Sequence, residues 1–218
     1  MGRAATPLIA VPLGLFALWV IINLLPDIIG YVGDKLTDDQ INASEYNDVE
    51  VLRSGLEGET YALKMLSKLS DEYHIFTNTI ITYDGKQSET DVIVVGPTGI
   101  FIVEVKNYKG TICGGCDDQS LVHIKTKGES EYVYNPLKQV STHVYRLANF
   151  LRDKGIQCWV NGGVFFTNDA LTLEIDGDTE QCRKYMHSCL ELTSWIKENG
   201  SPLSEDVVNR IVSCIASL

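Results

Sequence analysis

The chain is short of positive charge. Its 218 residues include 18 Lys and Arg against 29 Asp and Glu, which gives a formal net charge of −11 at pH 7. This is the wrong sign for a protein that holds nucleic acid by bulk electrostatic attraction, because the phosphate backbone repels it. Any binding of a polyanion must therefore depend on a local site, a bound metal ion or a partner.

A second closely spaced pair of cysteines is also missing. Six cysteines are present, but only Cys113 and Cys116 are near neighbours, in the sequence CGGC. A structural zinc site normally needs two such pairs. A thioredoxin-like pair should open a helix, whereas these cysteines stand among glycines typical of a hairpin tip. Incidental thiols, a disulfide or redox pair, and a metal site all remain open. A thiol-redox protein is thus one alternative function.

Internal repeats and low-complexity tracts are absent from the sequence. Hydrophobic residues make up 44% and charged residues 22% of the chain, which is typical of a globular protein. The length leaves room for one ordinary domain with appendages.

One long uncharged run stands near the N-terminus. Residues 8–25 read LIAVPLGLFALWVIINLL, and a helix of this length rises about 27 Å, close to the hydrocarbon thickness of a bilayer. Trp19 and Tyr31 are placed to lie near a membrane interface. The pattern predicts a single membrane anchor within residues 1–30. A cleavable signal peptide and a buried helix are the alternatives, and the flanking charges do not decide the orientation.

The rest of the chain predicts a mixed α/β domain. Residues 31–53 form a polar segment, either a linker or partly helical, before a main domain at 54–170 and a C-terminal helical extension at 171–218. Periodicity and caps predict helices over 56–69, 135–155, 187–198 and 203–216. Strands are expected over 74–82, 91–95, 100–106 and 158–168, with shorter ones near 110–113, 120–126 and 131–134. This order favours a central sheet flanked by helices.

The stretch DVIVVGPTGIFIVEVK, residues 91–106, combines an apolar hairpin with three charges. In simple register Val95 lies opposite Ile100, so Asp91 lies opposite Glu104, and Glu104 and Lys106 share that face. Two opposed carboxylates destabilise a sheet unless their charge is neutralised. Lys106 offsets one charge, and a bridging Mg²⁺ or Mn²⁺ would offset both. The alternative is that the three charges lie at a solvated sheet edge, and a one-residue bulge would break the register.

Four segments in this order resemble a known family. They are GLEGE, ETDVIVVGPTGIFIVEVKNYKG, NPLKQ and GGVFFTN, within residues 54–168. The combination is similar to the nuclease-related domain (NERD), a branch of the PD-(D/E)XK nuclease superfamily. The resemblance implies a restriction-endonuclease-like fold, a mixed sheet flanked by helices. Thr90 precedes Asp91, so the proline of the superfamily name is missing here.

The resemblance also implies a metal site. Asp91 and Glu104 correspond to the carboxylates that hold the principal Mg²⁺ or Mn²⁺, joined by the carbonyl of Val105. Glu59, in GLEGE, corresponds to the helical acid that binds a second ion or a metal-bound water.

Lys106 and Gln139 complete the implied catalytic set. Lys106 corresponds to the signature lysine, which orients or deprotonates the attacking water and stabilises the transition state. Its pKa would have to fall for it to act as a base. Gln139, in NPLKQ, resembles a glutamine that lines this site in related nucleases. Lys109 could contact a phosphate, or it could be a solvated turn residue.

The function implied is that of a membrane-tethered, metal-dependent nuclease acting on DNA. Access to intracellular DNA requires the domain to face the cytoplasm, with the N-terminus of the anchor outside. The expected partners are nucleic acid and the membrane. The alternative is a nuclease-like domain without turnover that serves as a binding or adaptor module at the membrane.

Overall fold

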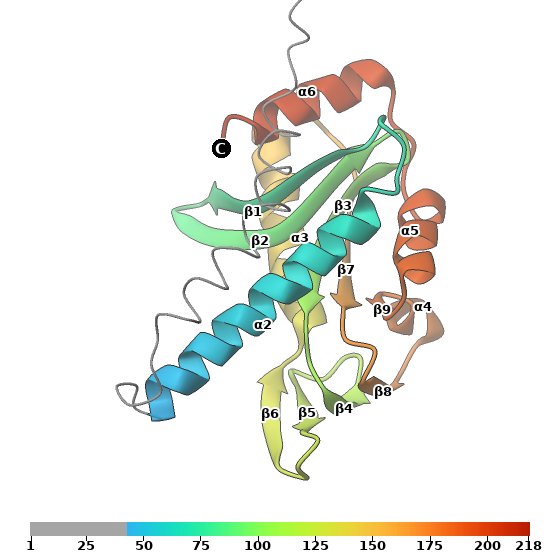
Figure 1. Ribbon diagram of the computed structural model, residues 1–218. Coiled ribbons are helices and arrows are strands. Elements are labelled where there is room, and N and C mark those ends of the chain that lie inside the picture. The colour runs from blue at the N-terminus through green and yellow to red at the C-terminus, as the bar shows by residue number, and fades with distance from the viewer. Residues whose placement is uncertain (1–42) are drawn as a thin grey trace, which may run out of the picture. The chain divides into compact units, whose positions relative to one another are not determined.

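A computed structural model describes residues 43–218 (Figure 1). The uncharged run at residues 8–25 and the anchor predicted around it lie outside this range. Within residues 43–218, no helix is both long and apolar enough to span a bilayer. By internal contacts the chain divides into two compact units, Met1–Arg53 and Ser54–Leu218. The second unit contains both sheets and the predicted site.

The described residues form both helices and strands. Their order and bounds are α2 (Ala43–Leu66), β1 (His74–Tyr83), β2 (Lys86–Gly96), β3 (Gly99–Lys106), β4 (Gly110–Gly115), β5 (Ser120–Ile124), β6 (Ser130–Tyr134), α3 (Pro136–Asp153), β7 (Val160–Phe166), β8 (Leu171–Asp176), α4 (Thr179–Cys182), β9 (Tyr185–Met186), α5 (Cys189–Glu198) and α6 (Glu205–Ile215).

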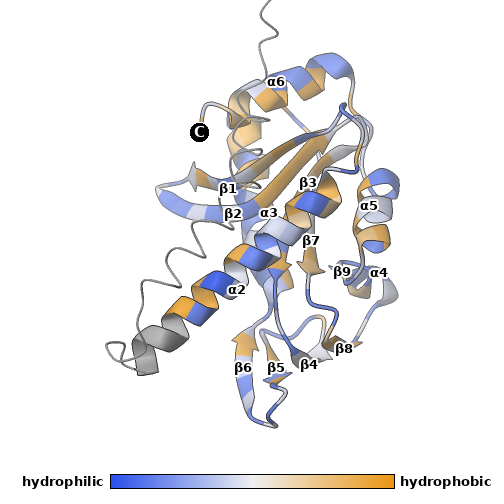
Figure 2. Ribbon diagram, viewed as in Figure 1, coloured by the Kyte–Doolittle hydropathy of each residue, from blue (hydrophilic) through white to orange (hydrophobic). Residues whose placement is uncertain are grey.

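The main sheet has five strands in the order β1-β2-β3-β7-β9. β1, β2 and β3 pair antiparallel, whereas β7 runs parallel to β3 and β9 runs parallel to β7. The predicted mixed sheet flanked by helices is therefore confirmed for the described residues. Figure 2 shows the second half of β2 and much of β3 as apolar. Such strands lack a polar face because the sheet is covered on both sides.

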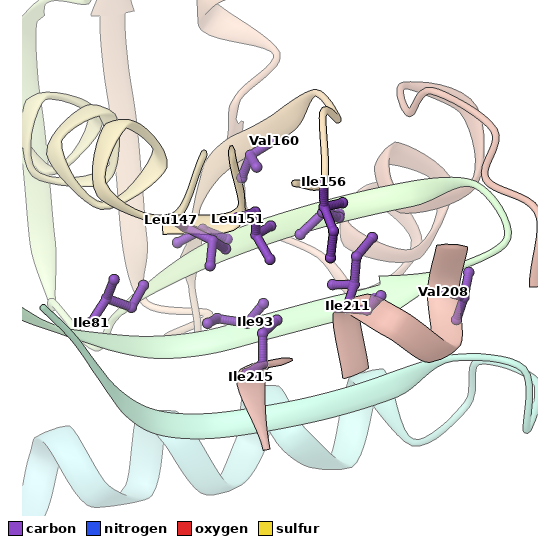
Figure 3. Close-up of a cluster of buried hydrophobic side chains, with 12 residues drawn as sticks. Ile81, Ile93, Leu147, Leu151, Ile156, Val160, Val208, Ile211 and Ile215 are labelled. Atoms are coloured by element: carbon purple, nitrogen blue, oxygen red, sulfur yellow. The ribbon is translucent and has the colours of Figure 1, made fainter. Parts of the chain in front are cut away.

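One face of this sheet packs on α3 and α6. Leu147 and Leu151 of α3 meet Ile93 of β2 and Ile211 of α6 in a fully apolar cluster (Figure 3). Ile102 of β3 belongs to the same cluster. Because side chains alternate along a strand, Glu104 points to the α3 face as well.

The part of α2 that follows Ser54 covers the opposite face. Tyr61 stacks on Phe165 of β7, with 6.3 Å between the ring centroids. At Gly58 an added Cβ would lie 3.0 Å from both the Asn107 Cβ and the Thr167 Oγ1. This lack of a side chain lets α2 pass close to the end of β3, where the predicted site lies.

A second sheet, in the order β6-β5-β4-β8, was not predicted as a separate unit. Figure 1 shows it beyond the C-terminal end of β3. β4–β6 fall on the three short strands expected from the sequence, but β8 was missed. Its sequence, LTLEID, alternates apolar and polar residues, and its burial alternates likewise. It joins the sheet by parallel pairing with β4, a partner more than fifty residues away in the chain.

The short helix α4 and the two-residue strand β9 were not predicted, and the boundaries of the predicted helices agree with the structure except at α2. This helix begins at Ala43, not near residue 56, and ends at Leu66. Residues 43–54, ASEYNDVEVLRS, contain neither glycine nor proline, so nothing in them interrupts a helix. α3, α5 and α6 begin and end within a few residues of the predicted bounds.

Asn135 fixes the start of α3. Its Oδ1 accepts hydrogen bonds from the Leu137 N–H (2.9 Å) and the Tyr185 hydroxyl (2.8 Å). Its Nδ2 donates to the carbonyls of Cys116 (3.1 Å) and Asp118 (2.8 Å). The side chain is fully buried and thus ties the helix that faces Glu104 to both sheets.

Replacing Asn135 by Ala is expected to lower the free energy of unfolding by about 2–4 kcal/mol. The substitution removes an N-cap and leaves buried polar partners unsatisfied. Urea unfolding followed by circular dichroism measures the loss. The matched control is Asn209→Ala on the exposed face of α6, which should change stability by no more than about 0.5 kcal/mol. Equal effects of the two substitutions would contradict the assigned role.

Candidate active site

The predicted register of the β2–β3 hairpin is confirmed. Val95 pairs with Ile100, and the pairing continues in step to Val92 opposite Val103. The next position in this register is that of Asp91 and Glu104, and the charge of Glu104 acts on Asp91. There the two strands separate, and the Asp91 Oδ2 accepts a hydrogen bond from the Val105 N–H at 2.7 Å. In a regular ladder a backbone carbonyl of β2 would accept the bond from the Val105 N–H. Here the Asp91 carboxylate accepts it instead.

The backbone of Val105 turns its polar groups toward Asp91. The N–H and C=O of one strand residue point to the same side. The neighbouring Lys106 carbonyl accepts from the Thr167 N–H beyond the end of β7, at 3.0 Å. The Val105 carbonyl therefore lies on the other side of β3, together with the Asp91 side chain.

Glu104 is buried, with only 1% of its surface exposed. Its Oε1 accepts from the Lys106 Nζ at 2.6 Å. Its Oε2 has no hydrogen-bond partner within the described part of the chain, although the His143 Nε2 of α3 lies 3.5 Å away. The alternative of a solvated sheet edge is therefore wrong for Glu104.

The charges around Glu104 shift the pKa values of its neighbours. Burial, and after it the negative charge of Glu104, raises the pKa of Asp91 to about 6. For Lys106, burial lowers the pKa, but Glu104 and, to a smaller extent, Tyr108 and Asp91 outweigh this, so that its pKa is raised. Lys106 is therefore a charged ammonium at neutral pH. This favours a role in orienting groups and stabilising charge over that of a general base.

Glu59 of α2 lies within electrostatic reach of the same site. Burial raises its pKa, a hydrogen bond to the Asn78 side chain lowers it, and the charges of Glu89 and Glu104 raise it. Asn78 stands in β1 beside Asp91, where the β1–β2 pairing skips one position, and has a positive φ of 48°. Asparagine tolerates this left-handed conformation better than most residues. Neither Asn78 nor Glu89 was predicted from the sequence.

The donor set around Glu104 is chemically suited to a divalent cation. An unpartnered carboxylate oxygen in a buried position is unfavourable unless a cation or proton meets it, and carboxylate and carbonyl oxygens are ligands for Mg²⁺ and Mn²⁺. Asp91, Glu104 and the Val105 carbonyl would hold such an ion. Among residues 43–218, however, no group of three His, Cys, Asp or Glu side chains is already arranged around one point as metal ligands.

The two remaining predicted residues stand apart from these contacts. Gln139 is half-buried in α3, and in the described part of the chain no hydrogen bond joins its side chain to Asp91, Glu104 or Lys106. Its role in the site stays a prediction. Lys109 is exposed, and its carbonyl is 2.8 Å from the His123 Nε2.

Sequence reasoning missed His143, which lies four residues after Gln139 on the same helix face. It is the side chain of α3 that approaches Glu104. The i,i+4 spacing in QVSTH was the available signal for it.

All six cysteines are free thiols. Cys113 lies in β4, and its Sγ approaches the Val122 carbonyl at 3.7 Å. Cys116 is buried and lies near Cys182 of α4, whose Sγ approaches the Ile175 carbonyl at 3.8 Å. The CGGC pair is thus not joined by a disulfide here.

The raised pKa of Asp91 predicts a pH dependence of stability in metal-free protein. The folded state keeps the Asp91 proton up to about pH 6, whereas the carboxyl normally titrates near 3.8. The folded state therefore binds more protons between these values, and the Asp91 contribution to the free energy of unfolding falls by about 2 kcal/mol as pH rises from 4 to 6. Urea unfolding in the presence of a chelator should show a flatter profile for Asp91→Asn. Parallel profiles for the two proteins would contradict the shift.

Comparison with known proteins places the chain in a family. The profile described as "Nuclease-related domain" matches residues 54–167, just over half of the chain. An uncharacterized protein of Bacillus anthracis is 44% identical over 62 residues, which cover 28% of this chain and 29% of that protein. The probable kinase PglW of Streptomyces coelicolor is 28% identical over 131 residues, covering 59% of this chain and 8% of that protein.

Both relatives thus match over less than a third of their own length. No solved structure matches the chain. The matched range of the family profile runs from the middle of α2 to the end of β7 and includes every site residue predicted from the sequence. The chain therefore belongs to the nuclease-related domain family.

Proposed function

We propose that the protein is a metal-dependent nuclease that hydrolyses phosphodiester bonds of DNA. Membership of the nuclease-related domain family supports a nuclease-related function at a coarse level. The main support for the finer proposal comes from the burial and hydrogen bonding of the Glu104 carboxylate. This buried carboxylate has one oxygen on Lys106 and the other without a hydrogen-bond partner among the described residues, and Asp91 lies beside it across the hairpin. Such an arrangement is unfavourable for folding alone and suits a site for a cation.

The proposed ligands of Mg²⁺ or Mn²⁺ are Asp91, Glu104 and the carbonyl of Val105. The hydrogen bond from the Val105 N–H orients Asp91, so that its second oxygen is available. Glu59 would bind a second ion or its water. When bound, the metal ion would acidify a water molecule and polarise the phosphoryl group.

Lys106 acts in this proposal as a fixed positive charge. The 2.6 Å contact with Glu104 positions its ammonium group, and its raised pKa keeps it protonated. An ammonium at this place orients the attacking water and stabilises the negative charge that builds up on the phosphoryl oxygens. Asp91 releases its proton more easily as cationic charge gathers at the site.

The proposal is tested with the full chain, purified in detergent. End-labelled duplex DNA, single-stranded DNA and RNA of one sequence are each incubated with Mg²⁺, Mn²⁺ or a chelator. Metal-dependent cleavage of the DNA substrates is the expected result. Cleavage of RNA alone would overturn the choice of substrate. Cleavage that persists in the chelator would overturn the metal dependence.

A nuclease-like binding domain without turnover is the second candidate. Two observations favour it: the net charge of −11 and the lack, within residues 43–218, of three side chains already converging as metal ligands. A calorimetric titration that detects no Mg²⁺ or Mn²⁺ binding, together with intact DNA in the cleavage assay, would establish this alternative.

The localisation is a separate proposal. The uncharged run at residues 8–25 is long enough to anchor the chain in a membrane as a single span. Access to intracellular DNA requires the nuclease-related domain to face the cytoplasm. Protease added to intact cells should then leave the domain uncut, and cut it after the membrane is opened. Cleavage in intact cells would place the domain outside.

A further inference from the structure

His143 is a buried imidazole whose ring nitrogens form no hydrogen bond within residues 43–218. Only about 5% of it is exposed, and neither Nδ1 nor Nε2 has a hydrogen-bond partner in the described part of the chain. It projects from α3, and its Nε2 lies 3.5 Å from the Glu104 Oε2, which is itself buried and unpartnered. In the described part of the chain, the His143 Nε2 and the Glu104 Oε2 therefore face each other at the predicted metal site, and neither has a hydrogen-bond partner.

Two other histidines of the chain, His123 and His187, have hydrogen-bond partners. His123 is about as buried as His143, but its Nδ1 is 3.2 Å from Glu131 and its Nε2 is 2.8 Å from the Lys109 carbonyl. The Nε2 of His187 is 3.1 Å from the Asn168 carbonyl. A buried imidazole without hydrogen bonds is energetically unfavourable. A ligand bound to His143 would remove this unfavourable state.

The separation of the two facing atoms suits a shared metal ion. A charge-assisted hydrogen bond between imidazole and carboxylate would be about 2.7–2.9 Å long. Two ligands bound to one ion at roughly 2.0–2.2 Å each lie about 3–3.5 Å apart when the angle between them is near tetrahedral or octahedral. The 3.5 Å between the His143 Nε2 and the Glu104 Oε2 is within this second range.

We propose that the His143 Nε2 is a direct ligand of the metal ion held by Glu104. The inference rests on the proposed function, because it concerns the same ion. An imidazole nitrogen adds a ligand that transition metals prefer and Mg²⁺ does not. The site therefore selects Mn²⁺ or a later divalent transition metal over Mg²⁺, unlike a site made of oxygens alone. In this arrangement Lys106 occupies the Glu104 Oε1 and the ion occupies the Oε2.

Electron spin resonance on the full chain tests the ligand directly. The protein is loaded with one equivalent of Mn²⁺, and spin-echo modulation from a coordinated nitrogen is recorded. Replacing ¹⁴N-histidine by ¹⁵N-histidine should change the modulation. His143→Gln should abolish it, and the control His187→Gln should leave it unchanged. Thermal unfolding shows whether each variant is folded, and the isotope exchange in the unsubstituted chain identifies a histidine ligand even where His143→Gln fails to fold.

Calorimetry measures the selectivity. His143→Gln replaces a nitrogen ligand by an amide oxygen of similar reach, so Mn²⁺ affinity should fall about tenfold or more while Mg²⁺ affinity changes much less. If Mn²⁺ binds and supports cleavage without nitrogen modulation, the ligand assignment fails and the nuclease proposal stands. If Mn²⁺ does not bind at all, both fail.

Discussion

Glu104→Gln is expected to slow metal-dependent DNA cleavage by at least about a thousandfold. The substitution keeps the size of the side chain but removes the charge that positions Lys106 at 2.6 Å and that would bind the metal ion. Loss of a positioned charged group at a catalytic centre commonly lowers the reaction rate by two to four orders of magnitude.

Lys106→Met should lower the rate by about a hundredfold or more, because the ammonium can no longer stabilise the phosphoryl charge. Initial rates on labelled duplex DNA measure both effects.

The matched control is Glu198→Gln, which removes an exposed carboxylate at the end of α5. Its cleavage rate should stay within about twofold of the unsubstituted chain, since it is not among the predicted site residues. Circular dichroism must show that Glu104→Gln is folded, because removing one partner of the buried Glu104–Lys106 ion pair lowers stability. Folded Glu104→Gln protein that cleaves at the normal rate would remove Glu104 from the active site.

The closeness of Asp91 to Glu104 could be predicted because it depends only on local rules. A short GPTG loop sets the hairpin register, and the strict alternation of strand side chains then fixes which residues share a face. The prediction holds because no bulge interrupts the β2–β3 pairing between Val92 and Gly99. A bulge would have moved Glu104 to the other face.

His143 could not be predicted in the same way. Helical spacing places it on the face of Gln139, but not above a particular strand. Its approach to Glu104 depends on β7, which pairs in parallel with β3 and carries α3 across the sheet. Asn78 likewise acquires its role only because β1 lies beside Asp91 in the folded sheet. The second sheet was missed for the same reason, since β8 finds its partner β4 far along the chain.

The placement of α3 against β7 leads to the second large effect. Gly162 of β7 lies directly under the helix, and an added Cβ would be 2.2 Å from the Val140 Cγ1 and 2.7 Å from the Val144 Cγ2. Gly162→Val is therefore expected to destabilise the protein by about 3 kcal/mol or more, at the upper end of overpacking effects. Because α3 must shift to relieve the clash, His143 should also move away from Glu104. Urea unfolding measures the stability.

Two further substitutions separate this steric effect from a general effect of losing glycine. Gly55→Ala in α2 has no atom within 4 Å of the new methyl group, and it should stabilise the helix by about 0.5–1 kcal/mol. The same change at Gly162 should destabilise, with the opposite sign. Val140→Ala should then restore part of the stability lost in Gly162→Ala, which gives a favourable coupling in a double-mutant cycle. Strictly additive effects would mean that α3 does not rest on β7 at Gly162, and the position of His143 over Glu104 would lose its structural basis.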